Sequence, residues 1–218
     1  GCENMLVNIF NDDSYVHDYY VTFSYRYSIP YEKGYRNRVK NKINSMPLNL
    51  LDISDFTANI KFVPIKILIF SFYHLLFLKY LFVCWNTLIL FKTFGKEKID
   101  LLHINSGGYP GAYSGMSAVF AARMRGIKRI VFVVNNIALS YKTPRRWIDY
   151  PLDRIVSKSV SVFVTGSAYA KRKLIEVLKL PSKYAVHIHN GIAPRKVTES
   201  RAEVISRLGV EDNQLIFA

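Results

Sequence analysis

Residues 100–111 read DLLHINSGGYPG, an apolar run that leads directly into a loop with three glycines. The run Asp100–Asn105 has the composition of a β-strand, and Ser106–Gly111 forms the loop after it. The same alternation continues along the chain, with predicted strands at Arg129–Val134, Val160–Thr165 and Tyr184–His189 and predicted helices at Ser114–Ala122, at Asp149–Ser157 and up to Leu178. Continuous apolar strands that alternate with helices predict an α/β fold, a parallel sheet with helices on both faces.

The segments on either side of this region are less regular. Residues 3–9 have apolar side chains at helical spacing, residues 20–25 indicate a strand, and the basic stretch 30–46 is predicted to be a loop. A linker at 193–197, a helix that ends at Leu208 and a strand that begins at Gln214 look like the opening of another α/β unit. We therefore expect one domain over residues 1–192. Residues 193–218 would be a linker and the truncated start of a second domain, which would make the chain a fragment.

Positive charge is concentrated in the middle of the chain. The formal net charge is +14, and residues 56–148 contain 13 Lys or Arg side chains against only Glu97 and Asp100. A localised basic excess indicates a surface that meets nucleic acid, a phosphorylated substrate or an acidic membrane leaflet. The same region is the most apolar in the chain, which favours the membrane. Cys2 and Cys84 form no metal or disulfide pattern, so a reduced cytosolic setting is expected.

The most apolar segment, residues 64–94, is expected to be a long helix. Two uninterrupted apolar runs of 12 residues each, Ile67–Leu78 and Tyr80–Phe91, are separated by Lys79. A membrane-spanning helix needs about 20 mostly apolar residues and disfavours a central lysine. We expect a helix that is partly buried in the fold and partly inserted into the bilayer surface, and a spanning helix and a core helix remain alternatives. In this interpretation, the lipid headgroups would be contacted by Lys66, Lys79, Lys92, Lys96 and Lys98. The side chains that would lie at the membrane–water interface are Tyr73, Tyr80 and Trp85.

Candidate binding residues follow three of the predicted strands. Ligands of open α/β sheets bind at the carboxyl ends of the strands, where loops present backbone amides and helix N-termini. The candidates for substrate binding at this edge are Ser106, Gly107, Gly108, Tyr109, Asn135, Asn136 and Ser167. The loop Ser106–Gly111 matches neither a dinucleotide fingerprint nor a Walker loop, and a tight turn without a ligand is its alternative. Ser167 has the alternative role of a helix cap.

Histidines offer weaker candidates. His103 lies inside a predicted strand and is expected to be buried in the core. His187 and His189 share one face of their strand, but no third ligand is evident, and we expect no metal site. No Ser-His-Asp or Cys-His arrangement stands out, so catalytic residues stay unassigned.

Several motifs, taken in order, resemble a known family. These are HIN at 103–105, GGYPG at 107–111, VVNN at 133–136, VTGS at 164–167 and HNGI at 189–192. They resemble the N-terminal, acceptor-side domain of glycosyltransferase family 4, and the resemblance is clearest over residues 100–208. Members of this family are retaining enzymes of the GT-B type, built from two Rossmann-like domains that face a cleft.

The resemblance implies roles for individual residues. Gly107 and Gly108 would lie in the cleft near the acceptor and the sugar phosphate, and Ser167 matches the serine that ends the third strand. Asn135 stands where many members have a histidine near the reacting sugar, and this departure puts a catalytic role for it in doubt. Asn190 and Gly191 would form the hinge into the donor domain. The family's donor-binding residues belong to that second domain and cannot be assigned in this chain.

The implied function is sugar transfer from a nucleotide-diphosphate donor to a glycan or lipid-linked acceptor, in bacterial cell-envelope or capsule synthesis. No metal or other cofactor is usually required in this architecture. Residues 64–98 and 142–147 would dock the protein on an anionic membrane, at the cytoplasmic face of the plasma membrane, without binding nucleic acid. The alternatives are a nucleotide-sugar epimerase of the same architecture and a non-enzymatic module that binds a membrane surface or nucleic acid.

Overall fold

Four parallel strands form the larger sheet of the protein. The computed structural model describes residues 2–189, 191 and 198–209. The sheet has the strand order β3-β4-β5-β6, with β3 at Leu102–Ser106, β4 at Ile130–Val134, β5 at Val162–Thr165 and β6 at Ala185–His187. Ser106 pairs with Val134, Val134 with Thr165, and Thr165 with His187, so the carboxyl ends of the four strands lie at one edge. The predicted parallel sheet is confirmed.

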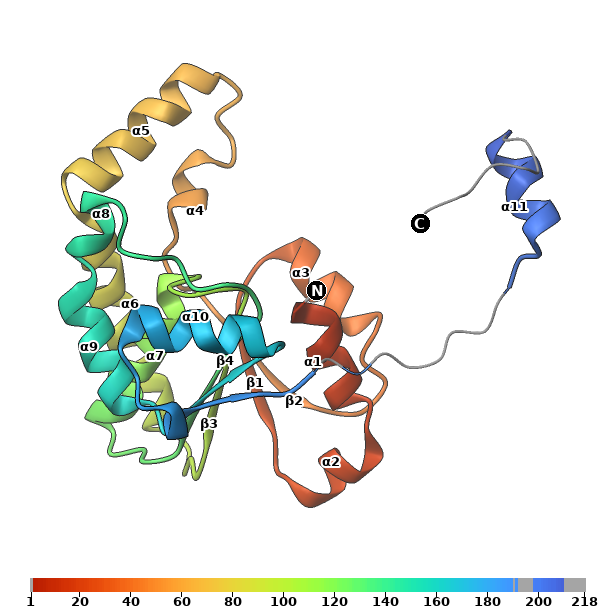
Figure 1. The fold of residues 1–218 in the computed structure, drawn as a ribbon, viewed down its shortest axis with the longest axis horizontal. Coiled ribbons are helices and arrows are strands. Elements are labelled where there is room, and N and C mark those ends of the chain that lie inside the picture. Colours follow the sequence, from red (N-terminus) through yellow and green to blue (C-terminus); the bar gives the residue numbers. More distant parts are fainter. Residues whose placement is uncertain (1, 190, 192–197, 210–218) are drawn as a thin grey trace.

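Helices connect these strands and cover the sheet (Figure 1). They are α7 at Tyr113–Met124, α8 at Pro144–Trp147, α9 at Tyr150–Ser159, α10 at Ala168–Leu178 and the short 3-10 helix η1 at Ser182–Tyr184. The core between helices and sheet contains the fully buried side chains Met116, Phe132, Phe163 and Leu174. The α/β fold predicted from the alternating pattern is therefore present, with the strand ends within two residues of their predicted positions.

A second, two-stranded parallel sheet lies in the N-terminal part of the chain. Its strands are β1 at Thr22–Arg26 and β2 at Asn44–Leu48, accompanied by helices α1 at Cys2–Phe10, α2 at Asp13–Asp18 and α3 at Ile29–Arg36. The prediction of a loop at 30–46 was wrong. Ser28 caps α3, its side chain accepting a hydrogen bond from the amide of Tyr31, and Tyr35 buries its ring against Phe23. Because α3 exposes a polar face and buries few residues, its sequence lacks the apolar periodicity from which helices are predicted.

The predicted long helix at 64–94 is two helices. α5 spans Val63–Leu75 and α6 spans Leu78–Phe94, preceded by the short α4 at Ile53–Thr57, and the axes of α5 and α6 differ by 75°. Phe77 lies between them in the left-handed region with φ of +53°, which ends the helical hydrogen-bond ladder. In the described part of the chain no single helix meets the length and hydropathy needed to cross a membrane, whereas this bent pair does so together. Figure 1 shows α5 extending away from the sheet.

Four side chains lie elsewhere than the headgroup, docking and core predictions placed them. One is Arg146 of the predicted docking segment 142–147, which is buried and pairs with Asp149 and Asp153. Lys79 is only 1% exposed, and its ammonium lies 2.7 Å from the Asp149 carboxylate instead of reaching headgroups. The Tyr73 ring is also buried, whereas Trp85 is exposed as expected. His103 on β3 is exposed, so its expected burial in the core was wrong. Burial of Lys79 is possible because the fold places a carboxylate from the distant α9 region beside it.

The last described helix, α11, spans Arg201–Leu208 and ends at Gly209, as the sequence predicts. Ser200 and Glu203 form a reciprocal capping box at its start. The predicted linker at 193–197, the hinge residue Asn190 and the strand from Gln214 lie outside the described residues. The proposed division at residues 192–193 therefore stays a prediction.

Candidate functional site

The glycine-containing loop after β3 is a tightly closed turn. The hydroxyl of Ser106 donates a hydrogen bond of 2.8 Å to the carbonyl of Gly108. Gly111 has φ of +59°, and a Cβ there would lie 2.3 Å from the Ser106 hydroxyl oxygen, so only glycine fits. A Cβ on Gly107, in contrast, would meet no atom within 4 Å. The loop therefore exposes backbone at Gly107 while Ser106 and Gly111 hold its shape.

The two asparagines after β4 lie against this loop. The side-chain amide of Asn135 donates to the Asn105 side chain at 2.8 Å and to the Ser106 carbonyl at 2.9 Å. Asn136 is exposed, and its Cβ lies 3.7 Å from where a Cβ on Gly108 would stand. The fold thus brings Ser106, Gly108 and both asparagines together, with Asn135 fixing the two strand ends and Asn136 facing solvent.

A small cavity of about 180 Å³ lies beside the loop. Its wall includes Gly111, Ala112, Tyr113 and Ser114, where α7 begins. The N-cap residue Ala112 offers no side-chain cap, so the first amides of α7 and the positive end of its dipole are available to a ligand. Other side chains in the wall come from β1, from the chain after β2 and from α5 and α6: Arg26, Leu51, Asp52, Ile53, Phe70, Tyr73, His74, Phe82 and Asn86. Such a wall suits a ligand with hydroxyl and phosphate groups.

Tyr109 anchors the loop in the core. Its side chain is 1% exposed, packs edge-on against Phe132 and Phe163, and donates a 3.0 Å hydrogen bond to Asp153. Burial raises the pKa of the Tyr109 hydroxyl, and the neighbouring Asp153 carboxylate adds to this effect. The side chain therefore positions the loop and does not face the cavity.

Asp153 belongs to a buried network of two cations and two carboxylates. Arg146 donates to Asp149 and to Asp153, each at 2.8 Å, and Lys79 donates to Asp149 at 2.7 Å. Hydroxyl groups complete the network: Tyr80 and Tyr113 donate to Asp149, and Tyr141 donates to Asp153. The four charges balance, which is the condition under which charges are tolerated inside a protein.

The two carboxylates of the network titrate in opposite directions. Burial opposes the ionisation of Asp149, but hydrogen bonds from Lys79, Arg146 and Tyr80 outweigh it and lower the pKa of this carboxyl. At Asp153 burial dominates and raises the pKa, with hydrogen bonds from Tyr141, Tyr109 and Arg146 opposing it. Asp149 is thus the carboxylate that holds both cations.

Comparison with known families decides the assignment. The sequence model of Glycosyltransferase Family 4 matches residues 56–196, more than half of the chain. The chain belongs to glycosyltransferase family 4. No curated protein and no solved structure gives a significant match. The matched range includes α5, α6 and the four-stranded sheet, so the glycine loop, the asparagines and the charge network all belong to the glycosyltransferase domain.

Two charged residues of the cavity wall, Arg26 and Asp52, were missed by the sequence interpretation. Arg26 ends β1 and donates to the Leu50 carbonyl and the Ser54 hydroxyl, besides pairing with Asp55. Asp52 follows β2 and caps α4 in a capping box with Asp55. The rule that carboxyl ends of strands carry ligands, applied to residues 20–25, would have indicated Arg26. Asp52 directly follows an apolar run and precedes Asp55 by three residues. This spacing is typical of a helix capping box and would have indicated Asp52.

None of the seven predicted substrate-binding residues is part of the cavity wall, which adjoins their loop only through Gly111. Ser167 is the N-cap of α10, its hydroxyl accepting from the amide of Ala170 at 3.1 Å, which confirms the helix-cap alternative. Gly191 is exposed, and its partner in the predicted hinge, Asn190, lies outside the described residues. The rings of His187 and His189 lie 5.4 Å apart, and the described residues include no cluster of three His, Cys, Asp or Glu suited to a metal.

Proposed function

We propose that this protein transfers a sugar, with retention of anomeric configuration, from a nucleotide-diphosphate donor to a glycan or lipid-linked acceptor. Membership of glycosyltransferase family 4 supports glycosyl transfer in general. The bacterial cell envelope or capsule is the pathway class that we propose for it. A metal ion is not needed in this proposal, because helix dipoles and basic side chains stabilise the leaving diphosphate.

The observation that carries the acceptor-side assignment is the cavity between Arg26 and the start of α7. It combines a guanidinium group with helix-start amides that have no side-chain cap, and at Gly111 it adjoins the loop that exposes the Gly107 backbone. These groups suit the hydroxyl and phosphate groups of an acceptor and of a sugar phosphate. In the proposed two-domain architecture, the nucleotide of the donor is held by the other domain, across the cleft.

Membrane association is proposed from the exposed surface of α5 and its neighbours. Ile67, Leu68, Phe72 and Leu75 on α5 are between 49% and 71% exposed, an unusual amount of apolar surface for one helix. Lys61 and Lys66 lie in the same part of the chain, and neither residue is paired with a carboxylate among the described ion pairs. An apolar face with basic neighbours is typical of proteins that bind the surface of an anionic bilayer. We place the protein at the cytoplasmic face of the plasma membrane, bound peripherally.

The test uses the substitution Gly107→Val with Gly34→Ala as its control. A side chain at Gly107 meets no protein atom within 4 Å, so the fold is expected to tolerate it. Gly34 lies in α3, away from the cavity residues. In the two-domain enzyme that the proposal assumes, assayed with labelled nucleotide sugars and a lipid extract, Gly107→Val is expected to lower kcat/KM at least about tenfold, because the valine displaces the acceptor or sugar phosphate. Gly34→Ala is expected to match the wild type.

The reaction product distinguishes glycosyl transfer from epimerisation of the nucleotide sugar. Transfer gives a glycosylated acceptor whose anomeric configuration, measured by NMR, is that of the donor. Conversion of the nucleotide sugar into its epimer without any acceptor would show an epimerase and contradict the proposal. Unchanged activity in Gly107→Val would contradict the position of the site.

A further inference from the structure

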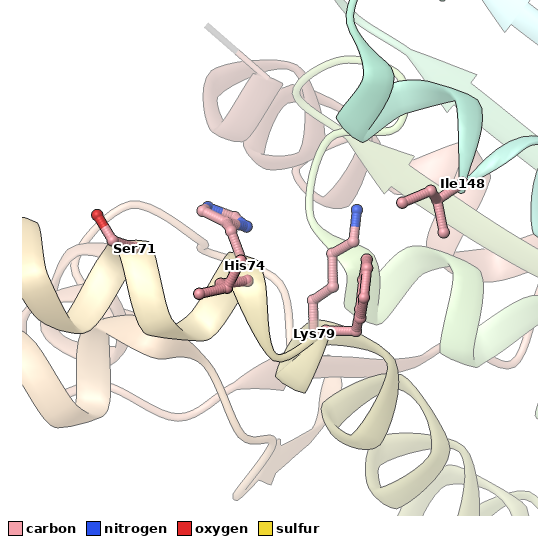
Figure 2. A pocket seen from close by; sticks show the side chains of 6 residues that line it. Ser71, His74, Lys79 and Ile148 are labelled. Carbon is pink, nitrogen blue, oxygen red and sulfur yellow. The ribbon is translucent and has the colours of Figure 1, made fainter.

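A second pocket, of about 370 Å³, lies where α5 meets α6 (Figure 2). Its lining consists of Ser71, His74, Leu75, Phe77, Lys79 and Ile148. Leu75, Phe77 and Ile148 provide an apolar surface, and Lys79 contributes its aliphatic stem because its ammonium is engaged by Asp149. The volume lies within the range of about 300–1,000 Å³ that is usual for small-molecule sites.

Exposed apolar side chains lie in the same chain segments as the pocket's lining residues. Leu76 and Leu81 on the α5–α6 side are 57% and 63% exposed, and Trp147 next to Ile148 is 60% exposed. These two segments are about 70 residues apart in the sequence and are joined by the hydrogen bond between Lys79 and Asp149. The pocket is therefore an inward extension of the surface that is proposed to meet the membrane.

The same pocket adjoins the cavity at the sheet edge. His74 lines both of them, so a single side chain forms part of the wall between the apolar pocket and the polar cavity. A second link is the 3.2 Å hydrogen bond between Lys79 in the pocket and Tyr113 in the cavity. The two spaces are therefore neighbours, with these side chains at their boundary.

We infer that the pocket binds the hydrocarbon chain of the lipid-linked acceptor, which places the acceptor's polar head in the cavity at Arg26 and the start of α7. This inference rests on the proposed function. It selects a lipid-linked acceptor over a soluble glycan, because a soluble glycan has no part that suits the apolar lining. It selects the acceptor over bulk phospholipid, because the adjoining cavity offers helix-start amides that have no side-chain cap to a polar head.

The experiment is photo-crosslinking of the purified protein with a C15 polyprenyl phosphate that carries a diazirine in its chain. The probe is presented in vesicles of phosphatidylglycerol and phosphatidylcholine, and labelled peptides are identified by mass spectrometry. Label is expected on the peptides that contain Leu75 and Ile148. Leu75→Trp fills the pocket and is expected to lower this labelling about tenfold. The matched control Leu68→Trp, on the same helix but outside the lining, is expected to leave the labelling unchanged.

Other outcomes contradict the inference in distinct ways. Equal labelling of wild type and Leu75→Trp would show that the chain does not enter the pocket. Competition by excess phosphatidylglycerol as effective as competition by unlabelled polyprenyl phosphate would show a general lipid contact. Glycosyl transfer by the proposed two-domain enzyme, measured in the same vesicles, separates the two proposals. Transfer without pocket labelling contradicts the inference alone, and labelling without transfer contradicts the proposed function.

Discussion

The environment of Lys79 in the structure differs from the one that its sequence position predicts. In the sequence it interrupts an apolar run, which predicts a side chain that reaches for water. In the fold it is buried beside Asp149, which also binds Arg146. A buried cation is stable only if a carboxylate and further hydrogen bonds replace the lost water, and Tyr113 together with Asp149 provides them. The partner is 70 residues away, so no local pattern could indicate it.

Removal of the Asp149 charge is expected to be strongly destabilising. Asp149→Asn leaves Lys79 buried without a counter-charge and weakens the hold on Arg146. Loss of one partner of a buried ion pair typically lowers the free energy of unfolding by about 3–5 kcal/mol, a large part of the ~5–15 kcal/mol that stabilises a domain. Urea denaturation measures the change. The exposed Asp100→Asn is expected to stay within about 0.5 kcal/mol of wild type, and an equally small change in Asp149→Asn would contradict the structural role of the network.

The two carboxylates predict opposite pH dependences of stability. The lowered pKa of Asp149 contributes stability that is present above the unfolded pKa of about 3.9 and is lost as the pH falls through the folded pKa. The raised pKa of Asp153 contributes stability that is present below about pH 3.9 and is lost as the pH rises through its folded pKa. Free energies of unfolding measured from pH 3 to 7 are therefore expected to rise less steeply with pH in Asp149→Asn, and more steeply in Asp153→Asn, than in wild type. Parallel profiles in the two variants would contradict these directions.

Among the elements, the buried strands were predictable and the polar or broken helices were not. Residues 130–134 and 162–164 are apolar on both faces, and that pattern has few other interpretations. α3 instead depends on a cap at Ser28 and a few buried rings. The break at Phe77 has no glycine or proline to mark it, and it is set by the packing of α6 against α7 and by the Lys79–Asp149 contact. At the site, the loop and the asparagines follow the predicted strands, whereas Arg26 and Asp52 come from the sheet whose second strand was not predicted.

Helix α5 is expected to dominate binding to anionic vesicles. Leu68 and Phe72 lie one turn apart, are about half exposed, and line neither cavity. The double substitution Leu68→Ser and Phe72→Ser removes apolar area worth about 1 kcal/mol at each site, so affinity is expected to fall roughly thirtyfold. Co-sedimentation with phosphatidylglycerol vesicles measures it. Leu208→Ser, a comparable exposed leucine on α11, serves as control, and equal binding by all three proteins would assign the membrane contact to another surface.

At the scale of the whole molecule, the described domain forms one side of the proposed cleft. In the proposal, its cavity receives the acceptor and the sugar phosphate, and a second domain holds the nucleotide of the donor. Residues 1–218 expressed alone are therefore expected to fold, to bind vesicles and to give no detectable turnover of nucleotide sugars, because positioning of both reactants accounts for much of enzymatic rate enhancement. A cooperative urea transition of the same preparation distinguishes an inactive folded domain from an unfolded one. Robust turnover by residues 1–218 would show that this domain binds the donor as well, and would move the donor site to the cavity between Arg26 and α7.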